Sequence, residues 1–189
     1  REVAYSTLAR PERKVRHLAA ARFFESLGSD ELAGALAGHY LAAYASAPDG
    51  PEREALGTQA RIALRAGADR AVALGAHGQA ITLCEQALTI TPDPADQAAL
   101  HERIGISAWV TQRVDLAERH FAKAVALQAG LRDRVAEART TAEYGRALLS
   151  FFHFEHALTL LVDASERFKD LGDGPTLARL DGQLARAWY

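Results

Sequence analysis

Methionine is absent from the 189 residues of this chain, and cysteine occurs once. A single cysteine excludes a disulfide within the chain and is compatible with a reducing compartment. The chain also lacks an uninterrupted apolar run of about 18 residues, which a membrane-spanning helix needs, and it has no signal-peptide pattern. We therefore expect a cytoplasmic protein without a membrane contact. The missing initiator methionine, with helical sequence at both ends, indicates a piece of a longer chain.

The chain also has little excess of charge of either sign and few aromatic side chains. The 22 basic and 24 acidic residues give a net charge of −2, which provides no bulk attraction to nucleic acid or anionic lipid. A locally basic run over residues 10–17 lacks the interleaved aromatics of a nucleic-acid site. Aromatics make up 7% of the chain but apolar residues 49%, so the core must consist largely of alanine and leucine. Both residues favour helices, and we expect an all-α fold.

One spacing of small and apolar residues occurs three times. The first copy reads Leu64, Gly67, Ala68, Ala71, Ala80, Cys84, Ala87 and Pro92; the second reads His101, Ile104, Gly105, Ala108, Ala117, Phe121 and Ala124; the third reads Thr141, Tyr144, Gly145, Leu148, Ala157, Leu161 and Ala164. Small residues at the eighth and twentieth positions let two helices of a hairpin approach closely, and the apolar residue at the twenty-fourth fills the space beside them. This is the pattern of a tetratricopeptide repeat (TPR), which buries its apolar face by stacking on neighbouring repeats.

The breaks between periodic segments predict about nine helices in a right-handed α-solenoid of antiparallel pairs. A first helix opens with Pro11 and stops at Gly28, and Ser29 is placed to cap a second that reaches residue 45. Residues 1–47 form an N-terminal segment that joins an upstream module, and a Pro- and Gly-containing linker follows. The repeats cover residues 52–92, 95–130 and 132–171, and the first helix of a truncated fourth begins at residue 176. The apolar face of that last helix predicts further repeats beyond Tyr189.

The surface best suited to binding is the concave face, which the first helix of each repeat lines in such solenoids. The repeat frame places the following residues there: Arg65, Asp69 and Val72; Glu102, Ile106 and Trp109; Arg139, Arg146 and Leu149; Arg179 and Arg186. Arginine forks and a tryptophan face are frequent binding anchors, so the C-terminal end suits an acidic or extended partner segment. The alternative is that the arginines solvate the surface or meet acidic residues of neighbouring repeats.

Catalytic motifs are missing from the sequence. No P-loop pattern occurs, which argues against nucleotide binding by this chain alone. His153 and His156 flank Glu155 at a turn, but two histidines supply at most half of a closed zinc shell, so a metal enzyme built on them is the weakest hypothesis. The remaining histidines are scattered, without a Ser or Cys arranged for nucleophilic catalysis: His17, His39, His77, His101 and His120. We expect no enzymatic activity, cofactor or metal.

Two stretches carry a resemblance to a known family. The junction that follows the ATPase module of large bacterial signalling ATPases resembles REVAYSTLARPERKVRHLAAARFFES, with matching residues Tyr5, Leu8, Arg13 and His17. The helical region beside it resembles DELAGALAGHYLAAYASAP and LRAGADRAVALGAHGQAITLCEQALTI, with matching residues His39, Tyr40, Ala43, Ala66, Gly67 and Ala71. The chain is most similar to the C-terminal repeats of actinobacterial-type proteins with a class III adenylate/guanylate cyclase domain and a P-loop ATPase. LuxR-type transcriptional regulators resemble it nearly as closely.

The resemblance implies a non-catalytic regulatory module of a signalling protein. Such a module binds a protein or peptide partner in its groove and biases the attached ATPase or cyclase domains. No catalytic residue carries over to this chain, and the lysine and asparagine positions of carboxylate-clamp repeats are missing. A purely structural scaffold, including one that forms a homo-oligomer, is the alternative hypothesis.

Overall fold

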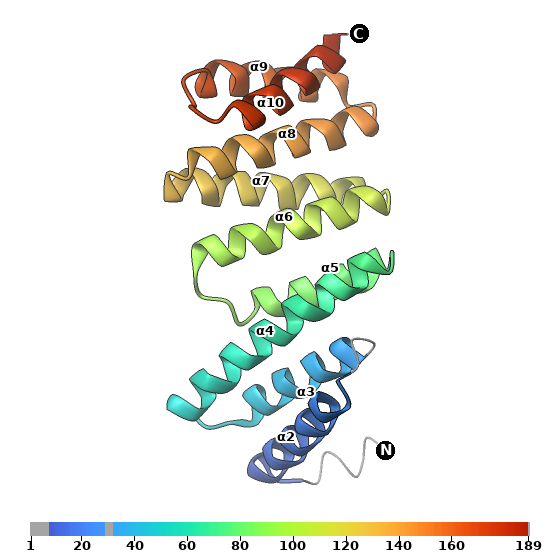
Figure 1. The fold of residues 1–189 in the computed structure, drawn as a ribbon, viewed down its shortest axis with the longest axis vertical. Helices are drawn as coiled ribbons and strands as arrows, with labels where there is room; N and C mark the ends of the chain where they lie inside the picture. The colour runs from blue at the N-terminus through green and yellow to red at the C-terminus, as the bar shows by residue number, and fades with distance from the viewer. Residues whose placement is uncertain (1–7, 29–31, 189) are drawn as a thin grey trace. The chain divides into compact units, whose positions relative to one another are not determined.

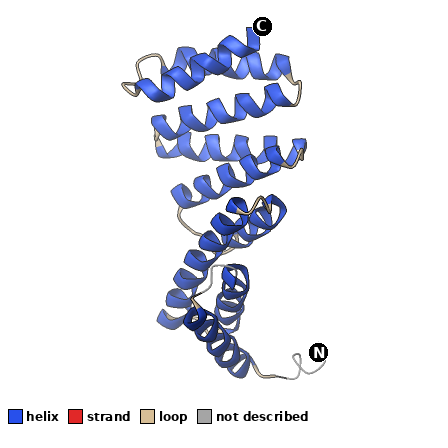
Figure 2. Cartoon of the chain, turned by 45° about the vertical axis from the view of Figure 1, so that its right-hand side comes forward, coloured by secondary structure: helices blue, strands red, loops and turns tan. Residues whose placement is uncertain are grey.

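The computed structural model describes residues 8–28 and 32–188, and this part of the chain contains nine helices and no strand (Figures 1 and 2). The helices are α2 (Arg10–Leu27), α3 (Ala33–Ser46), α4 (Pro51–Ala73), α5 (His77–Leu88), α6 (Pro94–Val110), α7 (Val114–Leu131), α8 (Arg134–Ser150), α9 (Phe154–Phe168) and α10 (Gly174–Trp188). The all-α prediction is confirmed, and the helix bounds lie within a few residues of those expected. None of the described helices is long and apolar enough to cross a membrane.

Proline and aspartate mark where several of these helices begin. Proline stands in the first turn of α2, α4 and α6, where its missing N–H has no intrahelical acceptor to lose. The Oδ1 atoms of Asp93 and Asp133 each accept a hydrogen bond from the backbone N–H group three residues further along the chain, at 2.9 and 3.0 Å. Asp173 caps α10 in the same way. The predicted cap at Ser29 lies outside the described residues.

Left-handed residues end several helices and turn the chain into the next one. Gly75, Gln112 and Phe152 occupy this conformation, with φ of 72°, 59° and 63°, at the turns that follow α4, α6 and α8. In the α6–α7 turn, the N–H groups of Gln112 and Arg113 donate to carbonyls at the end of α6, over 3.0 and 2.8 Å. These bonds satisfy carbonyls that the helix leaves open and fold the next helix back as an antiparallel partner.

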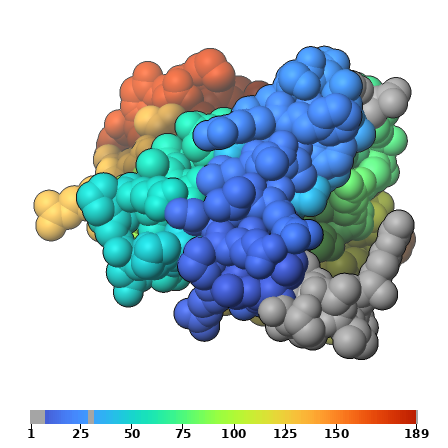
Figure 3. Space-filling view, turned by 90° about the horizontal axis from the view of Figure 1, so that it is seen from below, coloured from blue at the N-terminus to red at the C-terminus, as the bar shows by residue number. Residues whose placement is uncertain are grey.

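The chain divides into two compact units, residues 1–90 and 91–189. In the first unit α2 packs against α3, α3 against α4, and α4 against α5; Figure 3 shows α2 in dark blue against α3. Fully buried alanines dominate the contacts, among them Ala21, Ala37 and Ala43. Lys14 of α2 reaches Glu52 of α4 at 2.8 Å. The predicted domain boundary at residues 47–52 falls between α3 and α4 and stays a prediction.

In the second unit α6, α7 and α8 follow one another in chain order, and α10 packs against both α8 and α9 (Figure 1). Helix α8 contacts both α6 and α10 besides its sequence neighbours, so the first helices of successive hairpins share one side of the unit. A Cβ added to Gly105 would lie 3.0 Å from the Phe121 ring, and one added to Gly145 would lie 2.6 Å from Leu161 Cδ2. The eighth position of the repeat thus faces the twenty-fourth, as the TPR frame predicts, and only a small residue fits there.

Candidate interaction surface

Two contacts join α6 to α8 on their common side. The Nη2 atom of Arg139 lies 3.2 Å from Glu102 Oε2, and the guanidinium of Arg146 lies over the Trp109 ring, 4.1 Å from its centroid. We call Glu102, Trp109, Arg139 and Arg146 the arginine face. All four are predicted groove residues, and the structure brings them together in two cross-helix pairs.

The carboxylates of this surface lie deeper than its arginines. Glu143, one turn before Arg146 on α8, contacts the Arg146 guanidinium at 2.5 Å. The Glu102 and Glu143 side chains are 14% and 22% exposed, whereas those of Arg139 and Arg146 are 44% and 35% exposed. Solvent therefore meets mainly guanidinium groups, positioned from beneath by carboxylates. Glu143 is not among the residues predicted from the sequence, although its spacing of three residues from an arginine on a helix was available as a signal.

The remaining predicted arginines of the second unit lie on α10, which packs against α8 and α9. Arg179 and Arg186 are exposed and separated by two helical turns, so they share a side of α10. Arg186 donates to Gln183 at 3.4 Å, and within the described ranges Arg179 forms no ion pair. Among the described residues neither side chain forms a hydrogen bond or ion pair with the arginine face, so the predicted set is only partly assembled.

Other predicted groove residues lie in the first unit or are buried in the core. Arg65 and Asp69 belong to α4 of the first unit, where each has an interaction partner within the chain. The arginine face belongs to the second unit. Leu149, an expected inner position, is 8% exposed and contributes to packing. We therefore confine the candidate surface to the second unit.

The histidines form contacts that were not predicted from the sequence. His153 Nδ1 lies 2.6 Å from Glu118 Oε1, and His156 meets the Tyr144 ring edge-on. Among the described residues, no group of three or more His, Cys, Asp or Glu side chains could hold a metal ion.

Two histidine pairs also join neighbouring helices. The Nδ1 atoms of His17 and His39, and those of His101 and His120, are each 2.9 Å apart. A signal for the second pair was present in the sequence, because the repeat frame puts its members where the first repeat has Leu64 and Leu83. Leu83 is buried, so a histidine at the matching position was bound to be buried too.

Burial also raises the pKa values of Cys84 and Tyr144. It raises the pKa of the Cys84 thiol to about 11, and Cys84 is 2% exposed, so this residue packs as a small core side chain. Burial likewise raises the pKa of Tyr144 to about 12, with Glu118 adding to the effect. These groups remain neutral at physiological pH and have structural roles.

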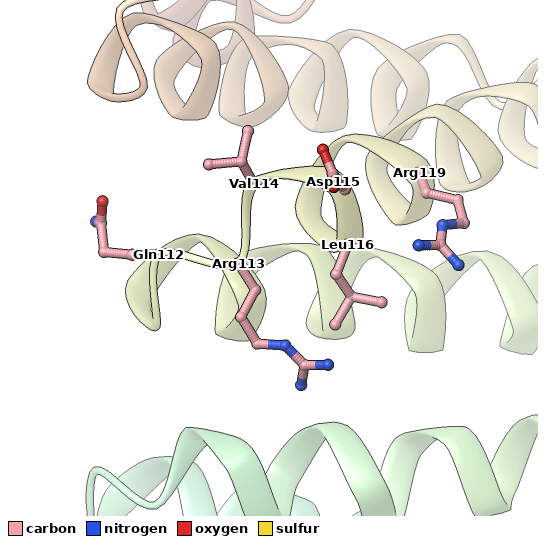
Figure 4. Close-up of a pocket in the computed structure, with 6 residues that line it drawn as sticks. All are labelled: Gln112, Arg113, Val114, Asp115, Leu116 and Arg119. Atoms are coloured by element: carbon pink, nitrogen blue, oxygen red, sulfur yellow. The ribbon is translucent and has the colours of Figure 1, made fainter.

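A shallow depression lies at the turn between α6 and α7. It is lined by Gln112, Arg113, Val114, Asp115, Leu116 and Arg119. In Figure 4 Arg113, Leu116 and Arg119 extend to one side of the start of α7, whereas Val114 and Asp115 extend to the other. The polar groups do not converge on one point, so this depression is a weaker candidate than the arginine face.

Comparisons with solved structures match this geometry to TPR-like repeats. A kinesin light chain-like protein from Podosopora anserina, with nearly identical TPR-like repeats, is 19% identical, with a TM-score of 0.64 over 96% of this chain and 87% of its own. A second structure of that protein gives the same identity and TM-score over 93% and 85%. The chain therefore has an all-α, TPR-like fold. No protein-family profile and no curated protein matches it.

Proposed function

We propose that this chain is a non-catalytic protein-interaction module whose arginine face binds an acidic, extended segment of a partner protein. The TPR-like fold supports an interaction role, since stacked hairpins present one face of successive first helices to a ligand. The observation that carries the proposal is the pairing of exposed guanidinium groups with deeper carboxylates and a tryptophan across α6 and α8.

The geometry favours a ligand with carboxylate or phosphate groups. Arg139 and Arg146 are seven residues apart, so they stand about 10 Å from each other along α8. A segment in the polyproline II conformation advances about 3.1 Å per residue and has three residues per turn, so acidic side chains three residues apart would lie on one side of it and meet both guanidinium groups. The ion pair with Glu102 and the ring of Trp109 hold the two arginines in place, which lowers the entropy lost on binding.

Peptide titration tests this binding role directly. Fluorescein-labelled acidic peptides with glutamates three residues apart are titrated with the full chain, and a lysine peptide of the same length is the control. We expect binding of the acidic peptide only, weakening as salt rises. Arg139→Gln and Arg146→Gln should each weaken it at least about tenfold, as expected for loss of a charged anchor. Arg119→Gln, an exposed arginine on α7, should not; equal weakening by all three variants would contradict the proposal.

The wider role follows from the family resemblance and is also a proposal. Arg13 and His17 of α2 match the segment that follows the ATPase module of signalling ATPases, and the module would bias those ATPase or cyclase domains when a partner binds. Coupling of this kind is typically about 1–3 kcal/mol. Deleting the chain from such a parent should change its rate of nucleotide turnover.

An unchanged turnover rate would favour the scaffold role instead. That role predicts self-association, or docking to the parent, that survives Arg139→Gln and Arg146→Gln. Sedimentation velocity of the chain and of both variants measures self-association. A LuxR-type parent would make the same module part of a transcriptional regulator.

A further inference from the structure

A pair of histidines joins the two helices of the α6–α7 hairpin. His101 and His120 approach through their Nδ1 atoms at 2.9 Å, with ring centroids 4.9 Å apart. His120 is 7% exposed. The first unit contains the same arrangement between α2 and α3, where the Nδ1 atoms of His17 and His39 are also 2.9 Å apart. The contact is therefore a repeated element and joins neighbouring helices in both units.

The hydrogen bond between the two Nδ1 atoms can form in only some protonation states of the rings. One Nδ1 atom must carry a proton and donate it, and the other must be bare and accept it. Two neutral rings in opposite tautomers meet this need, and so does one neutral ring beside one cation. Two cations do not, because both Nδ1 atoms would then carry protons and face each other. The protons of such a pair are gained in steps that belong to both rings together.

The charges around His101 and His120 oppose protonation. Lys123 acts on both rings and Arg119 acts on His120, each from α7. From α8, Arg139 faces α6, where it engages Glu102 beside His101. Burial, followed by Lys123, lowers the pKa of His101. Burial, followed by the charge of His101 and then by Lys123 and Arg119, lowers the pKa of His120 to about 4.

We infer that His101 and His120 form an acid-sensitive joint, which holds α6 against α7 when neutral and releases the hairpin when the pH falls. The direction of the pH effect follows from the linkage between protonation and folding. Since the folded state holds His120 neutral, its stabilising effect is complete above the unfolded value of 6.5 and is lost as the pH falls from there toward about 4. The open hairpin takes up protons that the closed one excludes.

The joint also bears on the arginine face, and this extension rests on the proposed function. Glu102 directly follows His101, and Trp109 lies about two turns further along α6. Both pair with arginines of α8. Separation of α6 from α7 would shift the helix that supplies half of the arginine face, so acidification should release a bound acidic segment.

Urea unfolding at several pH values tests the joint independently of any ligand. Both tryptophans, Trp109 and Trp188, lie in the second unit, so their fluorescence reports on that unit. The test variant carries His101→Asn and His120→Asn, because asparagine places a donor and an acceptor near the Nδ1 position and does not titrate. Between pH 7.5 and 5.0 the unfolding constant of the wild type should rise roughly 30-fold more than that of the variant. The control His156→Asn changes an exposed histidine and should retain the wild-type profile.

Equal pH profiles for the wild type and the double variant would overturn the inference. If the double variant does not fold, imidazole ¹⁵N shifts of the wild type decide the matter. At pH 5.5 the folded protein should show one neutral Nδ1–H ring and one neutral Nε2–H ring at these positions. Two protonated rings in the folded state would refute the joint. An acidic peptide that fails to bind at any pH would instead refute the proposed function and leave the joint intact.

Discussion

The Arg146 guanidinium contacts the Trp109 ring of α6 and the Glu143 carboxylate of its own helix at the same time, at 4.1 Å from the ring centroid and 2.5 Å between Nη2 and Oε2. The stack ties two first helices of successive repeats together on the surface that we assign to binding. A planar guanidinium is suited to this double role, because it stacks on a ring through its face and donates through its edge.

Arg146→Lys should separate stacking from charge. The substitution keeps the cation but removes the plane that lies on Trp109, so we expect a loss of about 0.5–1 kcal/mol in the free energy of unfolding and a change in Trp109 fluorescence. Urea titration followed by fluorescence measures both. Arg186→Lys, at an exposed position of α10, is the matched control and should leave both unchanged. Identical behaviour of the two variants would show that the stack contributes nothing to stability.

The close crossing of α8 and α9 depends on Gly145. A methyl group there would lie 2.6 Å from Leu161 Cδ2, and Leu161 is fully buried, so Gly145→Ala should destabilise the second unit by about 1–3 kcal/mol. Gly182, on α10, has nothing within 4 Å of its would-be Cβ. Gly182→Ala should therefore stabilise by about 0.5–1 kcal/mol through helix propensity alone. Thermal unfolding compares the two, and a shift in the same direction for both would contradict the crossing geometry.

The twentieth repeat position makes a related prediction. Ala80, Ala117 and Ala157 are at most 1% exposed, and the extra atoms of a leucine have no free volume to occupy. Enlarging any one of them to leucine should lower the free energy of unfolding by about 1–3 kcal/mol. Ala122→Leu, at an exposed position of α7, should have little effect. Urea midpoints measure the difference, and full stability of all three leucine variants would mean that the repeat frame is misplaced.

The fold could be predicted from the sequence because the residues that determine it act on neighbouring parts of the chain. Proline, glycine and aspartate mark helix ends, and the spacing of small residues marks where helices cross. The errors are small and have physical causes: a helix predicted over residues 132–151 begins at Arg134, because Arg132 adopts the left-handed conformation that ends α7 and Asp133 caps α8. Such details depend on how two adjoining helices share the residues of one short turn.

The candidate surface followed only in part, because contacts across helices depend on how far one helix is shifted against the next. The repeat frame aligns Arg146 with Ile106, yet its guanidinium lies over Trp109, almost one turn further along α6. The same limitation hid the contact between His101 and His120. The frame identifies which residues share a face but not which of them touch.

Cys84 offers a probe of the first unit that needs no substitution. Its thiol is buried in α5, and burial raises its pKa to about 11, so at pH 8 the reactive thiolate is at least about 100-fold rarer than for a free cysteine with a pKa near 8.5. We expect iodoacetamide to modify the unfolded chain in urea at least about 100-fold faster than the folded one. Mass spectrometry at increasing urea then follows opening of the first unit, while tryptophan fluorescence follows the second. Rapid labelling in the absence of urea would mean that α5 separates from α4 under native conditions.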